Sequence, residues 1–588
     1  MCGIAGLMTA GGAPDPLILD KLVAALGHRG PDGRGRHVAG TVGLVHARLS
    51  IIDLEGGAQP LHGPRGIALV GNGEIYNYRD LSDAGMALAT GSDCEPPLHL
   101  YARHGLAMID ALRGMYALAI HDPGGDGGAE RLILARDPFG IKPLYLAEGA
   151  FGVAFASEPQ ALVAAGFARP VRVAEGPRDE LLQLQFTTGA ATVFSGIRRL
   201  LPGETVVVEG GRVVSSTRRA PAAAVGPRLT REAEALAAFD RAMADSVEAH
   251  QRADVPYGMF LSGGIDSSVL LALMARLNDR PVRAFTAGFP GTGVHDERAH
   301  ARALAAACGA EHIEVEVTER DFWDHLPAIA AAMDDPAADY AIVPTWLLAR
   351  EARKSVTVIL SGEGGDELFG GYGRYRAAMR PWPFARPMRR KGTFDGLDVL
   401  RREPAGWRAG MAAAEAAARK AGGSALSRAQ RVDMADWLPN DLLGKLDRCL
   451  MAHGIEGRVP FLDPVVAEVA FRLSDRLKVR GGQGKWLVRR WLAKALPAAR
   501  PFAPKKGFTV PVGEWIAARG DELGPLVAAS PGVHEIARPE AVAALFTAPG
   551  KRERFAAWTL LFYALWHRRH VQGQAMDGGV FDVLTSAP

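Results

Sequence analysis

The sequence predicts a two-domain protein in which an α+β layered domain precedes an α/β domain built on a parallel sheet. Short apolar or alternating runs separated by turn residues fill about the first 200 residues, as is typical of antiparallel strands. After a segment rich in Ala, Pro, Arg and Gly, strands alternate with longer helical patterns. That alternation is typical of a parallel sheet covered on both faces. The length of 588 residues is sufficient for two separate cores.

The composition is that of a large enzyme without nucleic-acid or membrane partners. Apolar residues make up 48%, charged residues 23%, and the net charge is only +3. No long basic block suggests a phosphate-backbone footprint, and no signal peptide or long apolar span stands out. The four cysteines form no CxxC pair, so neither a disulfide framework nor a zinc site is expected. These features predict a cytoplasmic protein.

The first domain is expected to span residues 2–214 and to be rich in strands. Two helical patterns interrupt the strands, and a hairpin-like stretch around Pro202-Gly203-Glu204 closes the domain. The helices are expected at Pro16–Leu26 and Pro97–His104, and the strands at Val42–Asp53, Ile67–Gly71, Met115–His121, Arg131–Arg136 and Phe151–Ala156. Residues 215–228 are predicted to be the linker, and residues 229–588 the second domain.

The second domain begins with regular strand–helix alternation. Strands are expected at Pro256–Leu261, Val282–Gly288, His312–Val317 and Val356–Leu360, and helices at Arg231–Arg252, Asp266–Leu277, His295–Cys308 and Pro344–Arg353. Two Gly-rich segments, 262–264 and 361–367, directly follow strands. Ligands of such sheets bind outside the carboxyl ends of the strands. Beyond about residue 400 the pattern is mostly helical.

Cys2 is the first candidate for catalysis. Removal of Met1 would give this thiol a free α-amino group with a pKa of about 7.7–8.0, which is suited to a general base. Arg48 precedes an apolar run and offers a guanidinium for a carboxylate. Asn72 and Gly73 are expected at a strand end, where a side-chain amide and a backbone N–H can face an oxyanion. Asp93 is an acid suited to an ammonium group.

The Gly-rich loop at Ser262 is suited to phosphate. A short Gly/Ser turn opening a helix presents backbone N–H groups to an anion. It is no Walker A loop, because the Gly-Lys pairs that end at Lys445, Lys485 and Lys551 are followed by neither Ser nor Thr. Asp266 and the acidic segment at 363–367 add the oxygen ligands that Mg²⁺ takes beside substrate phosphates.

Six N-terminal motifs together resemble the class II glutamine amidotransferases, which have an α+β N-terminal-nucleophile sandwich fold. They are Cys2-Gly3-Ile4-Ala5-Gly6, His28-Arg29-Gly30-Pro31-Asp32, Arg48-Leu49-Ser50-Ile51-Ile52-Asp53, Asn72-Gly73-Glu74-Ile75-Tyr76-Asn77, Gly91-Ser92-Asp93 and Arg136–Tyr145. The resemblance implies that Cys2 attacks the glutamine amide and that Asn72 and Gly73 form the oxyanion hole. Arg48, Glu74 and Asp93 would bind the glutamine carboxylate and amino group. Gly71 departs from the valine more usual in the family.

The second half resembles the synthetase domain of asparagine synthetases. This α/β pyrophosphate-loop fold, like that of adenine nucleotide α-hydrolases, adenylates a carboxylate and releases pyrophosphate. The motifs are Ser262–Ser268, Ser361–Gly371 and Glu456–Asp463. The resemblance implies an ATP site, Mg²⁺ on Asp266 and Asp366, and catalytic roles for Glu363 near the acyl-adenylate and Lys505 at the phosphorus. The ATP site would comprise Leu261, Ser262, Gly263, Gly264, Asp266, Ser267, Gly288 and Gly362. The choice of Lys505 over Lys506 rests on the family pattern.

The resemblance therefore implies a glutamine-hydrolysing asparagine synthetase that acts on glutamine, aspartate and ATP, with a homodimer as its expected assembly. An enclosed passage between the sites would keep ammonia unprotonated and the adenylate dry. Two alternatives stay open. The chain is a related amidotransferase for another carboxylate, such as a peptide, sugar acid or specialised metabolite, since Gly454 and Gly457 stand where Ser and Ala are more usual. Or it is a non-catalytic paralogue, against which the intact set of Cys2, Arg48, Asn72, Asp93, Asp266, Glu363 and Asp366 argues.

Overall fold

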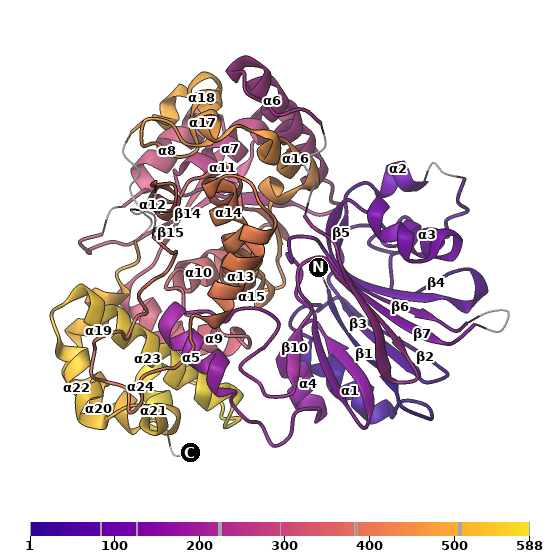
Figure 1. Ribbon diagram of the computed structural model, residues 1–588, viewed down its shortest axis with the longest axis horizontal. Coiled ribbons are helices and arrows are strands. Elements are labelled where there is room, and N and C mark those ends of the chain that lie inside the picture. Colours follow the sequence, from indigo (N-terminus) through magenta and orange to yellow (C-terminus); the bar gives the residue numbers. More distant parts are fainter. Residues whose placement is uncertain are drawn as a thin grey trace.

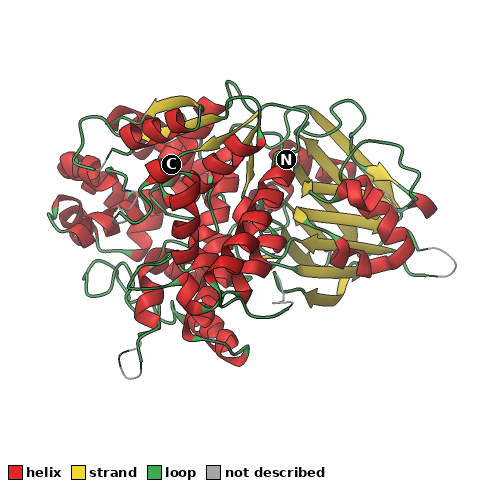
Figure 2. Ribbon diagram, turned by 90° about the horizontal axis from the view of Figure 1, so that it is seen from above, coloured by secondary structure: helices red, strands yellow, loops and turns green. Residues whose placement is uncertain are grey.

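The computed structural model describes residues 2–82, 85–124, 128–221, 226–294, 296–381, 384, 386–503 and 509–586. Two regions of different character lie side by side (Figures 1 and 2): a strand-rich N-terminal half and a mostly helical C-terminal half. Among the described residues, no helix is long and apolar enough to cross a membrane.

The N-terminal half is a sandwich of two six-stranded sheets whose paired strands are all antiparallel. In order across the first sheet lie β10 (Ile197–Arg199), β8 (Tyr145–Gly149), β9 (Gly152–Ala156), β1 (Gly3–Thr9), β3 (Val42–Arg48) and β2 (Gly33–Ala39). The second contains β12 (Arg212–Arg218), β11 (Glu204–Glu209), β7 (Arg131–Arg136), β6 (Gly114–Asp122), β5 (Ala68–Ile75) and β4 (Leu61–His62). Apolar side chains of both sheets, such as Ile4, Leu44, Val70 and Leu146, form the buried layer between them. This arrangement confirms the predicted sandwich.

Helices cover the outer faces of the sandwich. Helix α1 (Pro16–Ala25) begins at Asp15, whose side chain accepts a hydrogen bond from the Leu17 N–H, and it packs with α4 (Pro159–Ala165) on the first sheet. Helix α3 (Glu95–His104) packs on the second sheet. The remaining elements of this half are α2 (Tyr78–Ser82), α5 (Glu175–Leu184), η1 (Pro64–Gly66) and η2 (Gly105–Ala111).

Three strand ends differ from the sequence prediction. Strand β3 ends at Arg48, short of Asp53. Strand β5 continues to Ile75, so Asn72, Gly73 and Glu74 lie within the strand rather than after it. Their backbones pair with Ala117, Tyr116 and Met115 of β6, a long-range register that the short apolar run did not reveal. Strand β12 extends to Arg218, into the residues assigned to the linker, because it pairs with β11.

The C-terminal half is built on a five-stranded parallel sheet in the order β15 (Glu311–Glu316), β14 (Arg283–Gly288), β13 (Tyr257–Phe260), β16 (Val358–Leu360), β17 (Glu456–Arg458). The four predicted strands are present, and β17, which was not predicted, forms one edge strand of the sheet. Helix α6 (Glu232–His250) precedes β13. The helices between the strands are α7 (Ile265–Leu277), α8 (Arg298–Ala307), α9 (Glu319–Ala332), α10 (Ile342–Ala352), α11 (Gly365–Phe369), α12 (Gly373–Ala378), α13 (Ala409–Lys420), α14 (Ala425–Val432), the π-helix η3 (Asp433–Leu443) and α15 (Gly444–Met451).

The chain after β17 is helical, as predicted. It comprises η4 (Pro460–Leu462), α16 (Pro464–Arg472), α17 (Asp475–Lys478), α18 (Trp486–Ala495), η5 (Pro497–Ala499), α19 (Val512–Ala518), α20 (Gly520–Ala529), α21 (Pro531–Ile536), α22 (Pro539–Thr547), α23 (Lys551–His570) and α24 (Val580–Thr585). The buried helix α23 is tied to the loop after α9 by indole hydrogen bonds from Trp558 to the Ala338 carbonyl and from Trp566 to the Asp334 carbonyl.

Buried ion pairs join the two halves. Arg29 binds Asp447 of α15, with Nη1–Oδ2 at 2.8 Å, and also Glu158 of its own half. Arg199 pairs with Asp335, and Arg113 pairs with Asp463. These charges are compensated within the interface, as buried charges must be. The contact therefore fixes the position of β17 and α15 against the sandwich.

Candidate active site

Cys2 precedes β1 and lies against β5 of the facing sheet. Its backbone N–H donates to Asn72 Oδ1 at 3.1 Å, and its thiol lies 3.9 Å from the Leu49 carbonyl oxygen. Burial raises the pKa of the Cys2 thiol, so deprotonation needs a nearby base. Once Met1 is removed, the nitrogen that now donates to Asn72 becomes that base.

The side-chain amide of Asn72 has a hydrogen-bond donor that is not used. The residue is fully buried, and its Nδ2 has no hydrogen-bond partner among the described residues. A buried amide N–H without an acceptor is costly unless a ligand completes it. Gly73 follows with φ +152°, and a Cβ there would lie 2.0 Å from the Met115 carbonyl oxygen, so only glycine fits. The Asn72 amide and the Gly73 backbone are thus suited to an oxyanion.

Two carboxylates lie beside the thiol. Asp93 is buried and accepts the Ile75 N–H at 2.8 Å, and burial raises the pKa of Asp93 to about 6. Glu74 Oε2 pairs with Arg458, whereas Glu74 Oε1 is buried without a hydrogen bond among the described residues. Both side chains can accept from an ammonium group.

Arg48 organises the loop beside the thiol. Its guanidinium donates from Nη1 to the Leu54 carbonyl at 3.0 Å and from Nη2 to the Asp53 carbonyl at 2.5 Å. These bonds fix the segment that follows β3 and leave the guanidinium part-buried. Cys2, Asn72, Gly73, Glu74 and Asp93 lie close together, and Arg48 directly precedes Leu49, whose carbonyl lies by the thiol.

Sequence reasoning missed the contribution of β17 to this site. Arg458 is fully buried and bonds to both Glu74 and Glu456, and Lys142 Nζ donates to the Gly457 carbonyl at 3.2 Å. Strand β17 belongs to the parallel sheet, so the C-terminal half supplies a side chain to the thiol site. The Glu-Gly-Arg sequence carries no strand pattern, and only its position in a family motif marked it.

The second site lies at the carboxyl edge of the parallel sheet. The loop after β13 leads into α7, and the loop after the neighbouring β16 leads into α11. Gly263 has φ +68°, and the Ser262 hydroxyl accepts the Gly264 N–H at 3.3 Å. Buried Leu261 and Gly288, at the end of β14, border the same edge. The loop exposes the N-terminus of a 13-residue helix, a place suited to phosphate.

The two loops approach closely because glycines line their contact. A Cβ on Gly362 would lie 2.9 Å from the Asp266 Cβ, and one on Gly365 would lie 2.4 Å from Asp266 Oδ1. The sequence-predicted residues of both loops are therefore brought together. Ser267 also faces inward, with its hydroxyl 3.1 Å from that of Ser262.

Lys485 is the residue of this site that sequence reasoning did not select. Its buried ammonium bridges Asp266 and Asp366, at 2.7 Å from Asp366 Oδ1. Although burial opposes the charge, the two carboxylates raise the pKa of Lys485, so the ammonium stays protonated. Lys485 has φ +56° at the start of α18, after a Gly-rich run. That run was the available signal. Lys505, the predicted choice, lies outside the described residues.

Glu363 faces a second group of charges. Burial raises the pKa of Glu363, and the ammonium of Lys445 opposes that rise. Lys445 Nζ donates to Asp339 Oδ2 at 2.7 Å, and the buried Asp441 carboxylate has no hydrogen bond among the described residues. A cation and several carboxylates at one end of the phosphate loops are suited to a small zwitterion.

The described residues contain no cluster of three or more His, Cys, Asp or Glu side chains placed to hold a metal. Asp266 and Asp366 bring two hard oxygen donors to one cation, Lys485. Mg²⁺ commonly takes one or two carboxylates together with phosphate oxygens. The donor set therefore fits Mg²⁺ that arrives with a nucleotide.

The fold and these two sites define a class of enzyme: an N-terminal thiol amidotransferase fused to a pyrophosphate-loop domain. The family described as asparagine synthase matches residues 238–568, and the glutamine amidotransferase domain family matches residues 1–218. A relative from Mycobacterium tuberculosis, named provisionally as a glutamine-hydrolyzing asparagine synthetase, is 35% identical over 97% of this chain and 98% of its own. Asparagine synthetase (glutamine-hydrolyzing) 1 of Bacillus subtilis is 31% identical over 98% of both chains. The chain belongs to the asparagine synthase family, which confirms the predicted resemblance.

Proposed function

We propose that the protein is a glutamine-hydrolysing asparagine synthetase, an ATP-dependent carbon–nitrogen ligase. Glutamine, aspartate and ATP would give asparagine, glutamate, AMP and pyrophosphate. The observation that carries the proposal is the presence, in one chain of this family, of a buried thiol beside an unsatisfied Asn72 amide and of two phosphate loops meeting at Lys485.

At the first site, Cys2 would attack the glutamine amide carbon. The thiol proton passes to the α-amino group, and the tetrahedral oxyanion accepts hydrogen bonds from Asn72 Nδ2 and the Gly73 N–H. Such donors contribute about 2.7–4 kcal/mol each to transition-state binding. Glu74 and Asp93 would hold the substrate ammonium, and Arg48 its carboxylate. Collapse releases ammonia, and water then frees glutamate from Cys2.

At the second site, an aspartate carboxylate oxygen would attack the α-phosphorus of ATP. Ser262, Gly263, Gly264 and Ser267 would hold the phosphates, and Leu261, Gly288 and Gly362 would border the adenosine. Asp266 and Asp366 would hold Mg²⁺, which neutralises the pyrophosphate charge. Lys485, and Lys505 as the family pattern implies, would stabilise the charge on the phosphorus. Ammonia then attacks the acyl carbon near Glu363, and AMP leaves.

A second candidate function concerns the acceptor alone. An amidase of Penicillium rubens is 31% identical over 65% of this chain and 61% of its own, so named relatives include one with another activity. Gly454, with φ +63°, and Gly457 lie beside Pro31 and Leu446 respectively. Glu363 is not among the atoms nearest to either glycine, so these two positions give no reason to prefer another acceptor.

The test is pyrophosphate release with ATP, Mg²⁺ and glutamine, measured with and without aspartate, and with mass analysis of the product. Aspartate-dependent pyrophosphate and asparagine are the expected result. A Cys2→Ala variant should lose glutamine hydrolysis and regain asparagine formation when ammonium is added. Glutamine hydrolysis without aspartate-dependent pyrophosphate would assign a different carboxylate. Loss of both activities in Cys2→Ala, even with ammonium, would contradict separate sites.

We further propose a cytoplasmic homodimer, with a second domain at residues 229–588 and an N-terminal domain that β12 extends from the expected 214 to Arg218, which shortens the expected linker 215–228 to 219–228. The support is the family and the absence of a candidate membrane helix among the described residues. Sedimentation of the purified chain measures the assembly.

A further inference from the structure

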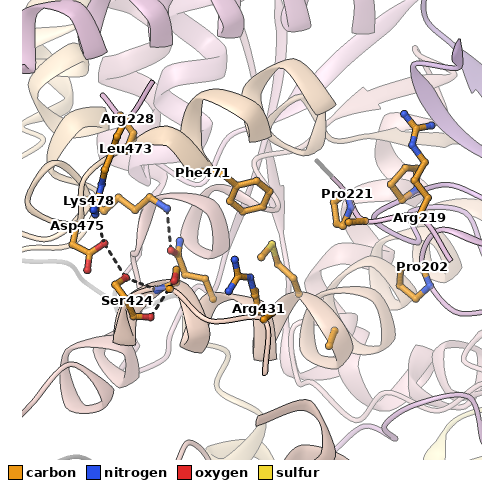
Figure 3. A pocket seen from close by; sticks show the side chains of 18 of the residues that line it. Pro202, Arg219, Pro221, Arg228, Ser424, Arg431, Phe471, Leu473, Asp475 and Lys478 are labelled. Carbon is orange, nitrogen blue, oxygen red and sulfur yellow. Dashed lines mark hydrogen bonds and ion pairs between the residues drawn. The ribbon is translucent and has the colours of Figure 1, made fainter. Parts of the chain in front are cut away.

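A pocket of about 580 Å³ lies between the two halves and away from both sites (Figure 3). The N-terminal half contributes the loop after β7, the turn before β11, the end of β12 and the linker, and the C-terminal half contributes α14, η3, α16 and α17. The lining residues that matter here are Arg218, Arg228, Ser424, Arg431, Phe471 and Lys478. No sequence-predicted site residue lines it. Its volume and its place at a domain interface are typical of small-molecule sites.

The lining is strongly cationic. Five of the lining residues are Arg or Lys, and Asp475 is the single carboxylate among them. The Asp475 carboxylate already has two partners: it accepts a hydrogen bond from the Ser424 hydroxyl at 3.0 Å and forms an ion pair with Arg228 at 3.6 Å. Arg219 is paired with Asp110 at 3.4 Å. The remaining cations, Arg218, Arg431 and Lys478, form no ion pair among the described residues.

These three cations bond only to neutral oxygens. Arg218 Nε donates to the Pro202 carbonyl at 2.9 Å, and Arg431 Nη1 donates to the Gly422 carbonyl at 2.5 Å. Lys478 Nζ donates to Gln430 Oε1 at 3.0 Å although only 3% of the lysine is exposed. Burying an ammonium group without a carboxylate partner is unfavourable, because no ion pair offsets the free energy of its desolvation. Burial accordingly lowers the pKa of Lys478 to about 7, against the raising effect of Asp475 on its own helix. Arg228 and Arg431 face it from the linker and α14 and lower it further.

Much of the remaining wall is apolar. Pro138, Pro202, Pro221, Met434 and Phe471 supply it, and the Phe471 ring lies 6.0 Å from Lys478 Nζ. Figure 3 shows the Arg431 guanidinium and the Phe471 ring between the prolines of the linker side and the Lys478 ammonium. Gln430, which holds that ammonium, also donates from Nε2 to the Leu368 carbonyl of α11 at 2.8 Å. The base of the pocket is thereby anchored to the helix that carries Asp366.

We propose that this pocket is a binding site for a small organic anion, with a phosphate or carboxylate head on Lys478 and Arg431 and an apolar body against Phe471 and the prolines. An anionic head supplies the partner that the two cations lack, and it forms charge-assisted hydrogen bonds with both. The site is distinct from those of glutamine and ATP, so it stands whether or not the proposed reaction is correct.

Isothermal titration of the full-length protein with phenyl phosphate, benzoate and the neutral benzamide tests the proposal. At least one of the two anions is expected to bind with one molecule per protein chain. The anion that binds more tightly shows whether the pocket prefers a phosphate or a carboxylate head group. Benzamide should bind at least tenfold more weakly, and saturating glutamine should not compete.

Variants locate the binding. Lys478→Met and Arg431→Met should each weaken the anion at least tenfold, whereas Arg428→Met should leave it unchanged. Arg428 is the matched control because it lies on the same helix and also donates to a glycine carbonyl, that of Gly423, without lining the pocket. Arg431 is exposed, so its variant folds even if Lys478→Met does not. Absence of anion binding, or equal affinity in Arg431→Met and wild type, would each overturn the proposal.

Discussion

At the residue scale, Asp93 gives the thiol site a pH dependence. Burial raises the pKa of Asp93 to about 6, so the carboxylate loses its charge as the pH falls through that value. Only the charged form attracts the substrate ammonium. The KM for glutamine should therefore rise about fivefold between pH 6 and pH 5 and stay nearly flat above pH 7. Glutamate release measured from pH 5 to 8 checks this.

The Asp93→Asn variant is the control for that profile. It should raise the KM at pH 7 and remove most of the change between pH 6 and pH 5, because the amide does not titrate. A wild-type KM that stayed constant down to pH 5 would show that Asp93 does not bind the ammonium.

Substitution of Lys485 is expected to affect pyrophosphate release but not glutamine hydrolysis. Its ammonium balances Asp266 and Asp366, and Lys485→Met would leave two neighbouring carboxylates that repel each other and the incoming phosphates. Pyrophosphate release should fall at least about 100-fold, as for loss of an electrostatic donor. Glutamine hydrolysis should persist.

Lys494→Met is the matched variant, because Lys494 lies on the same helix and is exposed. It should leave both rates unchanged. Pyrophosphate release at the wild-type rate in Lys485→Met would remove Lys485 from the phosphate site.

At the element scale, the entry into α11 depends on Gly364. This residue has φ +90°, and a Cβ there would lie 2.3 Å from Leu462 Cδ2. Gly364→Ala should therefore displace the loop that carries Glu363 and Asp366. Pyrophosphate release should fall more than tenfold, and the melting temperature should drop.

Gly309→Ala separates backbone strain from this steric clash. Gly309 also has positive φ, at +65°, but no atom lies within 4 Å of the added Cβ. Its cost should be limited to about 1–2 kcal/mol of conformational strain, without loss of activity. Equal effects of the two substitutions, measured by thermal unfolding and pyrophosphate assay, would mean that the contact with Leu462 is unimportant.

Sequence patterns correctly predicted the elements that are buried by their own periodic apolar side chains. Helix α7 and strands β13 and β14 have apolar periods and appear within a few residues of the expected ends. Strand β17 has the sequence Glu-Gly-Arg and no apolar period, since Arg458 is buried against Glu74 of the other half and Glu456 of its own strand. The π-helix η3 contains Pro439, which local propensity would place outside a helix.

Site residues divide in the same way, into those that a local motif identifies and those that only a long-range contact reveals. The family motifs identified Cys2, Asn72 and Asp266, and the structure brings them to two sites. Lys485 was overlooked because a single lysine after glycines resembles a surface residue. Only the long-range approach of α18 to the two strand-end loops shows that its ammonium is buried.

At the scale of the whole molecule, the two halves are expected to behave as one body. Their interface contains the buried pairs Arg29–Asp447, Arg199–Asp335 and Arg458–Glu74. Apolar side chains of both halves also belong to one continuous core cluster. Separation would expose this apolar surface and leave buried charges without their partners. Breaking one such pair by removing a partner costs about 3–5 kcal/mol.

Cleavage of the chain at a protease site engineered into residues 219–228, after the end of β12, should therefore leave both fragments associated. They should co-elute in gel filtration in 0.5 M NaCl, because buried pairs are screened by salt much less than exposed ones. The same cleavage in the Arg29→Met, Arg458→Met double variant should release separate fragments, since four buried carboxylates (Glu158, Asp447, Glu74 and Glu456) then each lose an arginine partner. If the cleaved wild-type chain itself separated at this salt concentration, the interface would be a weak contact. Arg458 could not then hold Glu74 in place across it.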